Sequence, residues 1–281
     1  MHFKSKNYTF NLELGPLVMG ILNVTPDSFA DNAKNFTFDA ALTSAQQMIK
    51  DGVDIIDIGG ESTRPGSNAV DVEEELKRVI PIIKAIRAES EIAISIDTWK
   101  SEVAGRAIEA GADIINDISG FQRDPEMKHV AAANGVGCIA MHMRGTPQTM
   151  MQFTEYDDLI QEMFDYFQVI IDDLTSLGIE KESICLDPGI GFSKNTAQNL
   201  LIINKLSSFT SFGVPVLLGP SKKSFIGQTL NLEKPDERDW GTAAAVACGI
   251  YRGATILRVH DVKEMKQVID MTMAILNSKE D

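Results

Sequence analysis

Short runs of apolar, mostly β-branched residues alternate along the chain with longer segments in which apolar residues recur at helical spacing. The short runs suit strands that are buried on both faces, and the longer segments suit amphipathic helices. Strands are predicted at 18–23, 55–58, 92–97, 114–118, 138–141, 184–187, 215–219 and 256–259. Helices are predicted at 72–89, 101–110, 159–177, 196–209, 242–252 and 262–277.

The places where predicted helices give way to strands share one residue order. Asp51-Gly52-Val53, Ala110-Gly111-Ala112 and Arg252-Gly253-Ala254 each lead into an apolar run, and glycine just past a helix supplies the left-handed conformation that ends it. Repeated strand-then-helix units over residues 17–281 predict a single α/β domain, a (β/α)8 TIM barrel. An open doubly wound sheet is the alternative. Residues 1–16 form an N-terminal extension whose loose alternation suits a short hairpin.

Composition and charge narrow the classes of partner. The chain has 281 residues and a formal net charge of −14, which disfavours binding to nucleic acid or to an anionic membrane surface. Cys138, Cys185 and Cys248 have no CxxC spacing, so neither a disulfide framework nor a zinc site is expected. The first residues lack an apolar signal core. We therefore expect a cytoplasmic protein that acts on small molecules.

Polar side chains stand at or just after the carboxyl ends of the predicted strands. They are Asn23, Asp57 with Glu61, Asp97, Asn116 with Asp117, His142, Asp187, Lys223, and Arg258 with His260. The active sites of TIM barrels lie at this end, so the ring indicates a site. Single members have other readings, since Asp97 and Asp187 also suit helix N-caps and an isolated His142 is more often structural.

Two groups within the ring suit different chemistry. Asp97, Asn116 and Asp187 suit a flat, nitrogen-rich heterocycle, because carboxylates accept hydrogen bonds from an amino-pyrimidine edge and an amide both donates and accepts. A metal site made of these three is the alternative. The second group is basic, with Arg64 in a Gly- and Pro-bearing loop and Arg258 and His260 after the last strand. With Asn23 this group suits a diphosphate, which usually brings magnesium, although Arg64 alone could be a solvated loop charge.

Two further segments could border a ligand. The first strand ends at Asn23, and Pro26 keeps the chain extended as it enters a loop with Asp27, Ser28 and Phe29. Gly219-Pro220-Ser221-Lys222-Lys223-Ser224-Phe225 follows the seventh strand and lacks Walker A spacing, so its lysines and hydroxyls suit a carboxylate or a ring carbonyl better than a nucleotide.

These residues belong to dispersed motifs that closely resemble the dihydropteroate synthase family from Leu17 to about Met271. The motifs are Gly20-Ile21-Leu22-Asn23-Val24-Thr25-Pro26-Asp27-Ser28-Phe29, Asp57-Ile58-Gly59-Gly60-Glu61-Ser62-Thr63-Arg64-Pro65-Gly66, Ser95-Ile96-Asp97-Thr98, Ile115-Asn116-Asp117-Ile118, Leu186-Asp187-Pro188-Gly189-Ile190-Gly191-Phe192, Ser221-Lys222-Lys223-Ser224-Phe225 and Arg258-Val259-His260-Asp261-Val262. The resemblance implies a folate-synthesis transferase that joins p-aminobenzoate to 6-hydroxymethyl-7,8-dihydropterin diphosphate. It also implies a homodimer and a sulfonamide target.

The resemblance assigns roles residue by residue. The pterin would be held by Asp97, Asn116, Asp187, Lys223, Met141, Phe192, Gly219 and Arg258. The diphosphate would be held by Asn23, Thr63, Arg64, Arg258 and His260, with Mg²⁺ at Asn23. The p-aminobenzoate pocket would be bordered by Phe29, Pro65, Phe192, Lys223 and Ser224. The residues expected to carry a dissociative displacement are Asp97, Lys223, Arg258 and Arg64.

Asp27, Ser28 and Phe29 are further expected to form a lid that closes over the bound pterin diphosphate. The sequence departs from the family pattern at Lys222, where Arg is usual, at Arg144, where Gln is more common, and in a first loop without a glycine pair. Two rival functions remain. A methyltetrahydrofolate-type methyltransferase would not need Thr63-Arg64-Pro65-Gly66 or Lys223-Ser224. A catalytically silent pterin-binding paralogue could keep most motifs, and the intact set of Asn23, Arg64, Asp97, Lys223 and His260 argues against it.

Overall fold

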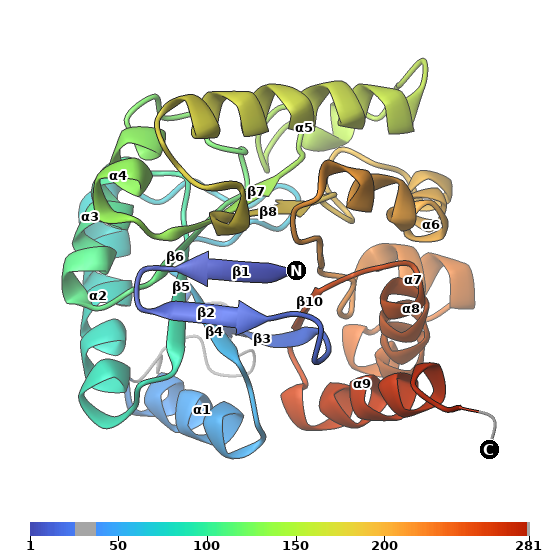
Figure 1. Ribbon diagram of the computed structural model, residues 1–281, viewed down its shortest axis with the longest axis horizontal. Coiled ribbons are helices and arrows are strands. Elements are labelled where there is room, and N and C mark those ends of the chain that lie inside the picture. Colours follow the sequence, from blue (N-terminus) through green and yellow to red (C-terminus); the bar gives the residue numbers. More distant parts are fainter. Residues whose placement is uncertain (26–37, 280–281) are drawn as a thin grey trace.

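A closed sheet of parallel strands forms the centre of the molecule (Figure 1). This computed structural model describes residues 1–25 and 38–279. The strands are β3 (Leu17–Asn23), β4 (Ile55–Gly59), β5 (Ala93–Asp97), β6 (Ile114–Asp117), β7 (Gly137–Met141), β8 (Ile184–Asp187), β9 (Leu217–Leu218) and β10 (Ile256–Val259). They pair in the order β8-β7-β6-β5-β4-β3-β10-β9, and a bridge between Leu186 and Val216 closes the ring. The predicted (β/α)8 barrel is confirmed.

Helices surround the sheet (Figure 1). They are α1 (Phe38–Lys50), α2 (Val72–Glu89), α3 (Ser101–Ala110), α4 (Met127–Asn134), α5 (Leu159–Ser176), α6 (Thr196–Asn204), α7 (Ser224–Leu230), α8 (Asp239–Tyr251) and α9 (Val262–Leu276), with 3-10 helices η2 (Met150–Gln152), η3 (Lys181–Ser183), η4 (Leu206–Phe212) and η5 (Pro235–Glu237). Alternate strand residues such as Ile56, Ile94 and Leu257 join the helices in the largest apolar cluster. Each such side chain contributes about 1.5–3 kcal/mol by burial.

The structure adds α1 and α4 to the predicted helices and differs from the predicted pattern at the seventh strand and its neighbours. β9 is shorter than the predicted 215–219 because the Val216 amide donates to the Thr255 hydroxyl (2.9 Å) instead of to a neighbouring strand. The helix predicted at 196–209 ends at Asn204 and continues as η4. The short helix α7, directly after Lys223, has too few residues to show a helical period.

The barrel interior changes from apolar to polar along the strands. Because side chains alternate across a strand, Ile55 and Asp57 of β4 lie on the same side, as do Ile114 and Asn116 of β6. The interior near the amino ends is an apolar cluster of Phe3, Leu12, Leu17, Met19, Ile55, Ala93, Ile114, Ile139, Cys185, Leu217 and Ile256. The residues two positions further along are polar on several strands, namely Asp57, Ser95, Asn116, Asp187 and Arg258. The alternation of the strands therefore sets a polar layer directly on an apolar one.

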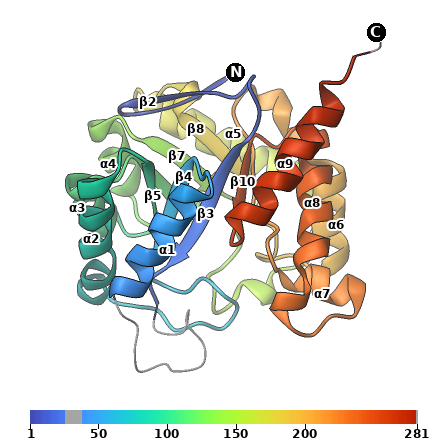
Figure 2. The same cartoon turned by 90° about the horizontal axis from the view of Figure 1, so that it is seen from below.

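A hairpin covers the amino end of the barrel (Figures 1 and 2). It consists of β1 (His2–Ser5) and β2 (Tyr8–Asn11), which pair antiparallel. Phe3 of β1 is fully buried in the interior apolar cluster. The loops that follow the strands, together with α7, lie at the opposite end (Figure 2).

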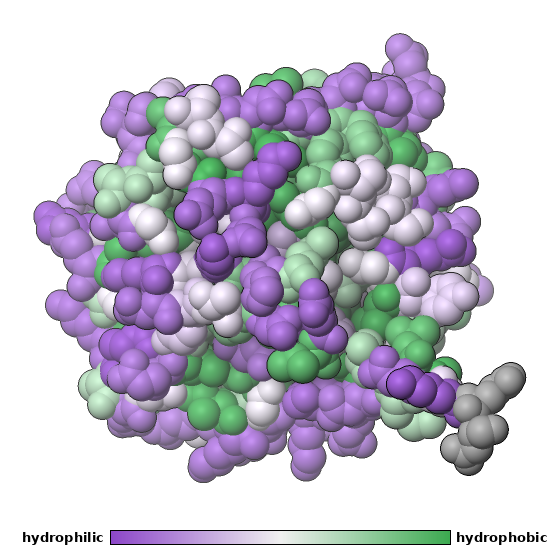
Figure 3. Space-filling model, in the orientation of Figure 1, coloured by the Kyte–Doolittle hydropathy of each residue, from purple (hydrophilic) through white to green (hydrophobic). Residues whose placement is uncertain are grey.

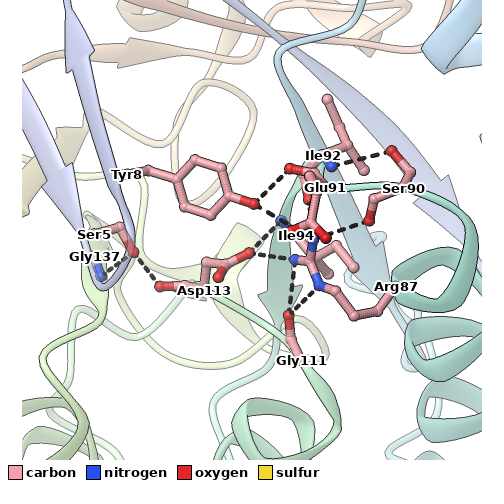
Figure 4. Close-up of polar contacts among 10 residues, drawn as sticks. All are labelled: Ser5, Tyr8, Arg87, Ser90, Glu91, Ile92, Ile94, Gly111, Asp113 and Gly137. Atoms are coloured by element: carbon pink, nitrogen blue, oxygen red, sulfur yellow. Dashed lines mark hydrogen bonds and ion pairs between the residues drawn. The ribbon is translucent and has the colours of Figure 1, made fainter.

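Polar contacts fasten this hairpin to the barrel (Figure 4). The Ser5 hydroxyl donates to the Asp113 carbonyl and accepts from the Gly137 amide (2.8 Å). Arg87 donates through Nη2 to the Asp113 carboxylate (2.6 Å) and through Nη1 to the Tyr8 hydroxyl (3.4 Å). The amino end of the barrel is thus sealed and suits a stabilising role, which leaves the carboxyl end for chemistry.

Across 1–25 and 38–279, no helix combines the length and the apolar character needed to cross a membrane.

Candidate active site

The polar ring predicted at the carboxyl ends of the strands is assembled in the structure. β3 ends at Asn23, and pairing across β4 and β5 brings Asn23, Gly59 and Asp97 to one level. Asn116 of β6 pairs in register with Asp97. β8 ends at Asp187. Residues that are far apart in the sequence therefore line one mouth of the barrel.

Arg258 of β10 joins two buried carboxylates. Its Nε donates to Oδ2 of Asp57 (2.6 Å), and its Nη2 donates to Oδ2 of Asp97 (2.8 Å). Asn116 Nδ2 also donates to Oδ2 of Asp57 (3.1 Å). Asp57 is fully buried and Asp97 is nearly so. One guanidinium thus compensates part of the charge of two carboxylates and fixes their orientation. We call Asp57, Asp97, Asn116 and Arg258 the floor.

Both floor carboxylates keep one oxygen without a hydrogen-bond partner in the part of the chain that the structure describes. These atoms are Oδ1 of Asp57 and Oδ1 of Asp97. Leaving a buried polar atom unpaired costs about 1–3 kcal/mol, so such an atom favours a ligand that can donate to it. The amino group and ring N–H of a heterocycle are donors of this kind.

Burial shifts the pKa values of Asp97 in the floor and of the nearby Asp187 and Lys223. Burial raises the pKa of Asp97 to about 7, with Arg258 opposing the shift and Asp57 reinforcing it. Burial also raises the pKa of Asp187, against the opposing charge of Lys223. Conversely, burial lowers the pKa of Lys223 to about 8 despite the nearby Asp187 carboxylate. Groups that titrate near pH 7 in a cleft are typical of functional sites.

Lys223 and Phe192 form a wall beside the floor. Lys223 Nζ lies 4.7 Å from the centroid of the Phe192 ring and donates to the Ile190 carbonyl. Asp187 Oδ1 accepts from the Gly189 amide (2.8 Å), which fixes that carboxylate at the start of the same loop. Lys223, Phe192 and Asp187 thus come together, as the sequence predicted.

A second group around His260 suits an anion. His260 Nδ1 lies 2.9 Å from Oγ of Ser221. Burial lowers the pKa of His260 to about 3, and the positive charges of Arg258, Lys222 and Arg64 add to the shift. Arg64 is exposed and makes no ion pair with any residue in the described ranges. Arg258 is paired with Asp57 and Asp97, and Lys222 is paired with Asp236, Asp239 and Asp261. Arg64 is therefore the rim arginine whose charge no carboxylate of the described residues compensates.

Asn23 is the residue expected to hold magnesium. The described ranges contain no cluster of three or more His, Cys, Asp or Glu side chains that could hold a metal ion. A Cβ at Gly59 would lie 3.6 Å from both Asn23 Oδ1 and Asp97 Oδ2, so these two side chains flank the same backbone position. A single amide oxygen fits Mg²⁺ only when phosphates and water supply the other ligands. The donor set therefore fits a magnesium ion that arrives with a diphosphate.

The remaining predicted residues lie at the rim or below it. Met141 is buried in an apolar cluster with Ile118, Met143 and Met150, against which Phe192 packs. Gly219 lies against Arg258, since a Cβ there would be 3.6 Å from that of Arg258.

The loop residues among the predictions are more exposed. Thr63 is half-buried, whereas Pro65 and Ser224 are exposed. Phe29, with Asp27 and Ser28, lies outside the residues that the structure describes, so the predicted lid does too.

The structure also decides between alternatives that the sequence left open. The N-cap reading of Asp97 and Asp187 is wrong: helix α3 begins after Lys100 and α6 is capped by Asn195. His142 is buried, and its Nδ1 lies 3.0 Å from Nζ of the buried Lys194, which suits a structural role.

One buried ion-pair cluster was missed by the sequence reading. Lys100 Nζ donates to carboxylates of both Glu61 and Glu75, and all three side chains are buried. Burial raises the pKa of Glu75, with the Lys100 hydrogen bond opposing the shift. Glu61 directly precedes the Arg64 loop, so this cluster anchors the base of that loop.

The fold and the site together define a barrel enzyme whose polar site lies at the carboxyl ends of its strands. A family model described as pterin binding enzyme matches residues 19–260. A dihydropteroate synthase from Synechocystis is 49% identical over 258 residues, which cover 92% of this chain and 89% of that protein. The chain therefore belongs to the pterin-binding enzymes and, within them, to the dihydropteroate synthase family.

Solved structures agree with this assignment. A dihydropteroate synthase from Yersinia pestis in complex with a sulfonamide drug superposes with a TM-score of 0.93 at 41% identity, over 99% of this chain and 100% of that one. A dihydropteroate synthase from Xanthomonas albilineans with 4-aminobenzoic acid gives a TM-score of 0.92 at 38% identity, with 99% of each chain covered.

Proposed function

We propose that this chain condenses 6-hydroxymethyl-7,8-dihydropterin diphosphate with p-aminobenzoate, giving 7,8-dihydropteroate and diphosphate by a dissociative displacement. The observation that carries the proposal is the arrangement of the Asp97 carboxylate. Arg258 fixes one of its oxygens while the other, buried, has no partner among the described residues. An anionic acceptor held in this way matches the amino-pyrimidine edge of a pterin.

The floor and the wall would hold the pterin. Asp97 and Asp187 accept from its amino and ring N–H groups, while Asn116 both donates and accepts. Lys223 donates to the ring carbonyl, and Arg258 stacks on the ring while it stays paired with Asp57. The flat ring would also contact the apolar side chains of Met141 and Phe192, and Gly219 leaves space for it because glycine has no side chain.

The rim would hold the diphosphate. Arg64 is exposed and makes no ion pair with the described residues, so its guanidinium can reach the diphosphate. Thr63 offers a hydroxyl, Arg258 approaches from β10, and His260 directly follows that strand. Asn23 would hold magnesium jointly with the diphosphate oxygens. When bound there, magnesium neutralises charge on the leaving group.

The p-aminobenzoate pocket would be bordered by Pro65, Phe192, Lys223, Ser224 and Phe29. Pro65 and Ser224 are exposed at the mouth, where a second substrate can enter after the pterin. The related enzyme from Xanthomonas albilineans was solved with 4-aminobenzoic acid and that from Yersinia pestis with a sulfonamide drug. The same pocket here would accept both types of ligand, which makes the protein a sulfonamide target.

The proposed chemistry needs no side-chain nucleophile. The bond from the pterin methylene to the diphosphate oxygen breaks first, and the leaving group takes the electron pair. Arg64 and the neutral His260, which donates through Nε2, stabilise the developing negative charge. The carboxylates of Asp97 and Asp187 stabilise the cationic pterin. The nitrogen lone pair of p-aminobenzoate then forms a bond to the methylene carbon, and the nitrogen loses a proton to water.

The purified chain is expected to form dihydropteroate and equimolar diphosphate from the two substrates in magnesium buffer. EDTA should stop the reaction and excess Mg²⁺ should restore it, because a single amide oxygen cannot hold the ion without the substrate. Chromatography of the pterins and an assay of released diphosphate measure both products.

The same assay distinguishes the rival functions. A methyltetrahydrofolate-type methyltransferase would leave the diphosphate ester intact. A silent paralogue would bind the pterin diphosphate and release nothing. Either result would contradict the proposal.

We also propose that the chain forms a homodimer through the outer face of α8. Between Asp239 and Arg252 this helix has no charged residue, and its outward Trp240 and Tyr251 are 87% and 71% exposed. The adjacent α9 exposes Met271. Figure 3 shows hydrophobic patches between polar residues in the region of α8 and α9. A helix that is apolar on both faces is normally covered, and a second copy offers a matching face.

Trp240→Glu is therefore expected to convert a dimer into a monomer. A charge in the centre of an apolar interface is desolvated without a partner, which costs several kcal/mol. Sedimentation velocity at micromolar concentration measures the change, and Val169→Glu on α5 is the control at an exposed apolar residue elsewhere. A wild-type monomer, or a dimer that survives Trp240→Glu, would rule out this interface.

A further inference from the structure

The segment after β7 contains a tight turn that no proposed substrate contact uses. The Met150 amide donates to the Thr146 carbonyl (2.7 Å), and the Thr146 amide donates to the Thr149 hydroxyl (3.1 Å). Met150 is buried in the apolar cluster beneath the site. The turn from Thr146 to Met150 is therefore ordered by its own hydrogen bonds and anchored by one apolar side chain.

This turn is hydrogen-bonded to the loop that contains Arg64 and Pro65. Gln148 Nε2 donates to the Ser67 carbonyl (2.6 Å), and the Gly66 amide donates to the Pro147 carbonyl (3.0 Å). The Ser67 amide in turn donates to the Arg64 carbonyl (3.1 Å), which closes the loop on itself. The turn thus contacts the Arg64 loop at Gly66 and Ser67, which directly follow Arg64 and Pro65 in the sequence.

The same segment is fastened to the Phe192 wall at its other end. The Arg144 amide donates to Oγ of Ser193 (3.0 Å), and the Arg144 guanidinium lies 3.9 Å from the centroid of the Tyr156 ring. The Tyr156 hydroxyl donates to the Ser193 carbonyl (3.0 Å). The segment from Arg144 to Tyr156 therefore links the Arg64 loop to the Phe192 wall, and p-aminobenzoate is proposed to bind between the two.

We propose that Gln148 is a positioning residue, which acts through the Arg64 loop to hold Pro65 in place for the arylamine substrate. The inference rests on the proposed function, because that function assigns Pro65 to the p-aminobenzoate pocket. Gln148 itself is exposed and touches no proposed substrate atom. Among the described residues, the Gln148 side chain provides the side-chain hydrogen bond of this link, whereas the Gly66–Pro147 contact is between backbone atoms.

Removing the Gln148 hydrogen bond should raise the KM for p-aminobenzoate about threefold to tenfold, the equilibrium effect of one net hydrogen bond. The affinity for 6-hydroxymethylpterin, which lacks the diphosphate, should stay unchanged, because the floor that binds it lies on the strands. Gln148→Ala removes the whole contact. Gln148→Glu is nearly isosteric and cannot donate to the Ser67 carbonyl, so it should match Gln148→Ala. Gln148→Lys restores a donor and should recover most of the wild-type KM.

Steady-state kinetics with p-aminobenzoate varied, together with calorimetry of 6-hydroxymethylpterin, tests this assignment. Gln161→Ala is the matched control, because that glutamine is also exposed but donates to Asp165 on its own helix. A wild-type KM in both Gln148→Ala and Gln148→Glu overturns the inference, as does a Gln148→Lys variant that is as weak as Gln148→Ala. If the wild type itself formed no dihydropteroate, the proposed function would fail first, so the two failures are distinguishable.

Discussion

Asp97→Asn is expected to lower kcat/KM for the pterin diphosphate by about 100-fold to 1,000-fold, the range found when one preorganised electrostatic partner is removed. The substitution keeps the size of the side chain but removes the charge that pairs with Arg258 and with the pterin. The pH profile adds an independent readout. Because the pKa of Asp97 is raised to about 7, the carboxyl is neutral below that pH. In the wild type, kcat/KM should therefore fall about tenfold per pH unit below 7, and Asp97→Asn should lack this dependence.

Asp117→Asn is the matched control for this prediction. Asp117 is also a fully buried carboxylate at a strand end, but its oxygens accept from Ser119 and from the Phe121 amide, all within its own loop. Asp117→Asn should lower the melting temperature, while kcat/KM of the folded enzyme stays at the wild-type value. If kcat/KM of Asp97→Asn stayed within a few-fold of the wild-type value and still fell below pH 7, the Asp97 carboxylate would not be the group that binds the pterin.

Arg64→Ala is the second large effect and should reduce kcat by about 100-fold. Arg64 is exposed and makes no ion pair with the described part of the chain, so its loss should not change the melting temperature. The effect should appear in the step that releases diphosphate, since that is where negative charge grows. Rapid-quench measurement of diphosphate release in a single turnover isolates this step.

Arg106→Ala provides the comparison for Arg64→Ala. Arg106 is another exposed arginine, and among the described residues it pairs with Glu109 on α3. Arg106→Ala should leave both the rate of diphosphate release and the melting temperature unchanged. If Arg64→Ala released diphosphate as fast as the wild type, Arg64 would be the solvated loop charge that the sequence left as an alternative.

The barrel could be predicted from the sequence because the strands are almost wholly buried and several helices, such as α2, α3 and α5, have a clear apolar period. The Gly111 and Gly253 helix exits mark where units repeat, and β8 and β10 begin and end where the pattern predicted. β9 could not be predicted to the residue, because its length depends on a hydroxyl of Thr255, which lies 39 residues from Val216.

The sequence predicted which polar residues surround the candidate site but not which of them pair with one another. Strand-end position alone identified Asp97, Asn116 and Asp187, since parallel strands bring their carboxyl ends together. The pairing of Arg258 with Asp57 spans 201 residues and exists only because the barrel closes. One signal was available: Asp57 lies two positions after Ile55, and the alternation of the strand places both in the interior.

The Glu61–Lys100–Glu75 cluster shows a different limit. Its members lie on a loop and two helix starts, and no short-range spacing connects them. Only the packing of α2 beside α3 brings Lys100 to both carboxylates. Sequence patterns report the period within an element, whereas such contacts depend on the distance between elements.

Calorimetric titration of two ligand fragments tests the division of the site into floor and rim most directly. The fragments are 6-hydroxymethylpterin and magnesium diphosphate, each titrated into the wild type, Asp97→Asn and Arg64→Ala. We predict that Asp97→Asn weakens binding of the pterin fragment about 10-fold to 100-fold and does not weaken binding of magnesium diphosphate. Arg64→Ala should weaken binding of magnesium diphosphate by a similar factor and leave binding of the pterin fragment unchanged. Equal losses for both fragments in either variant would contradict the account.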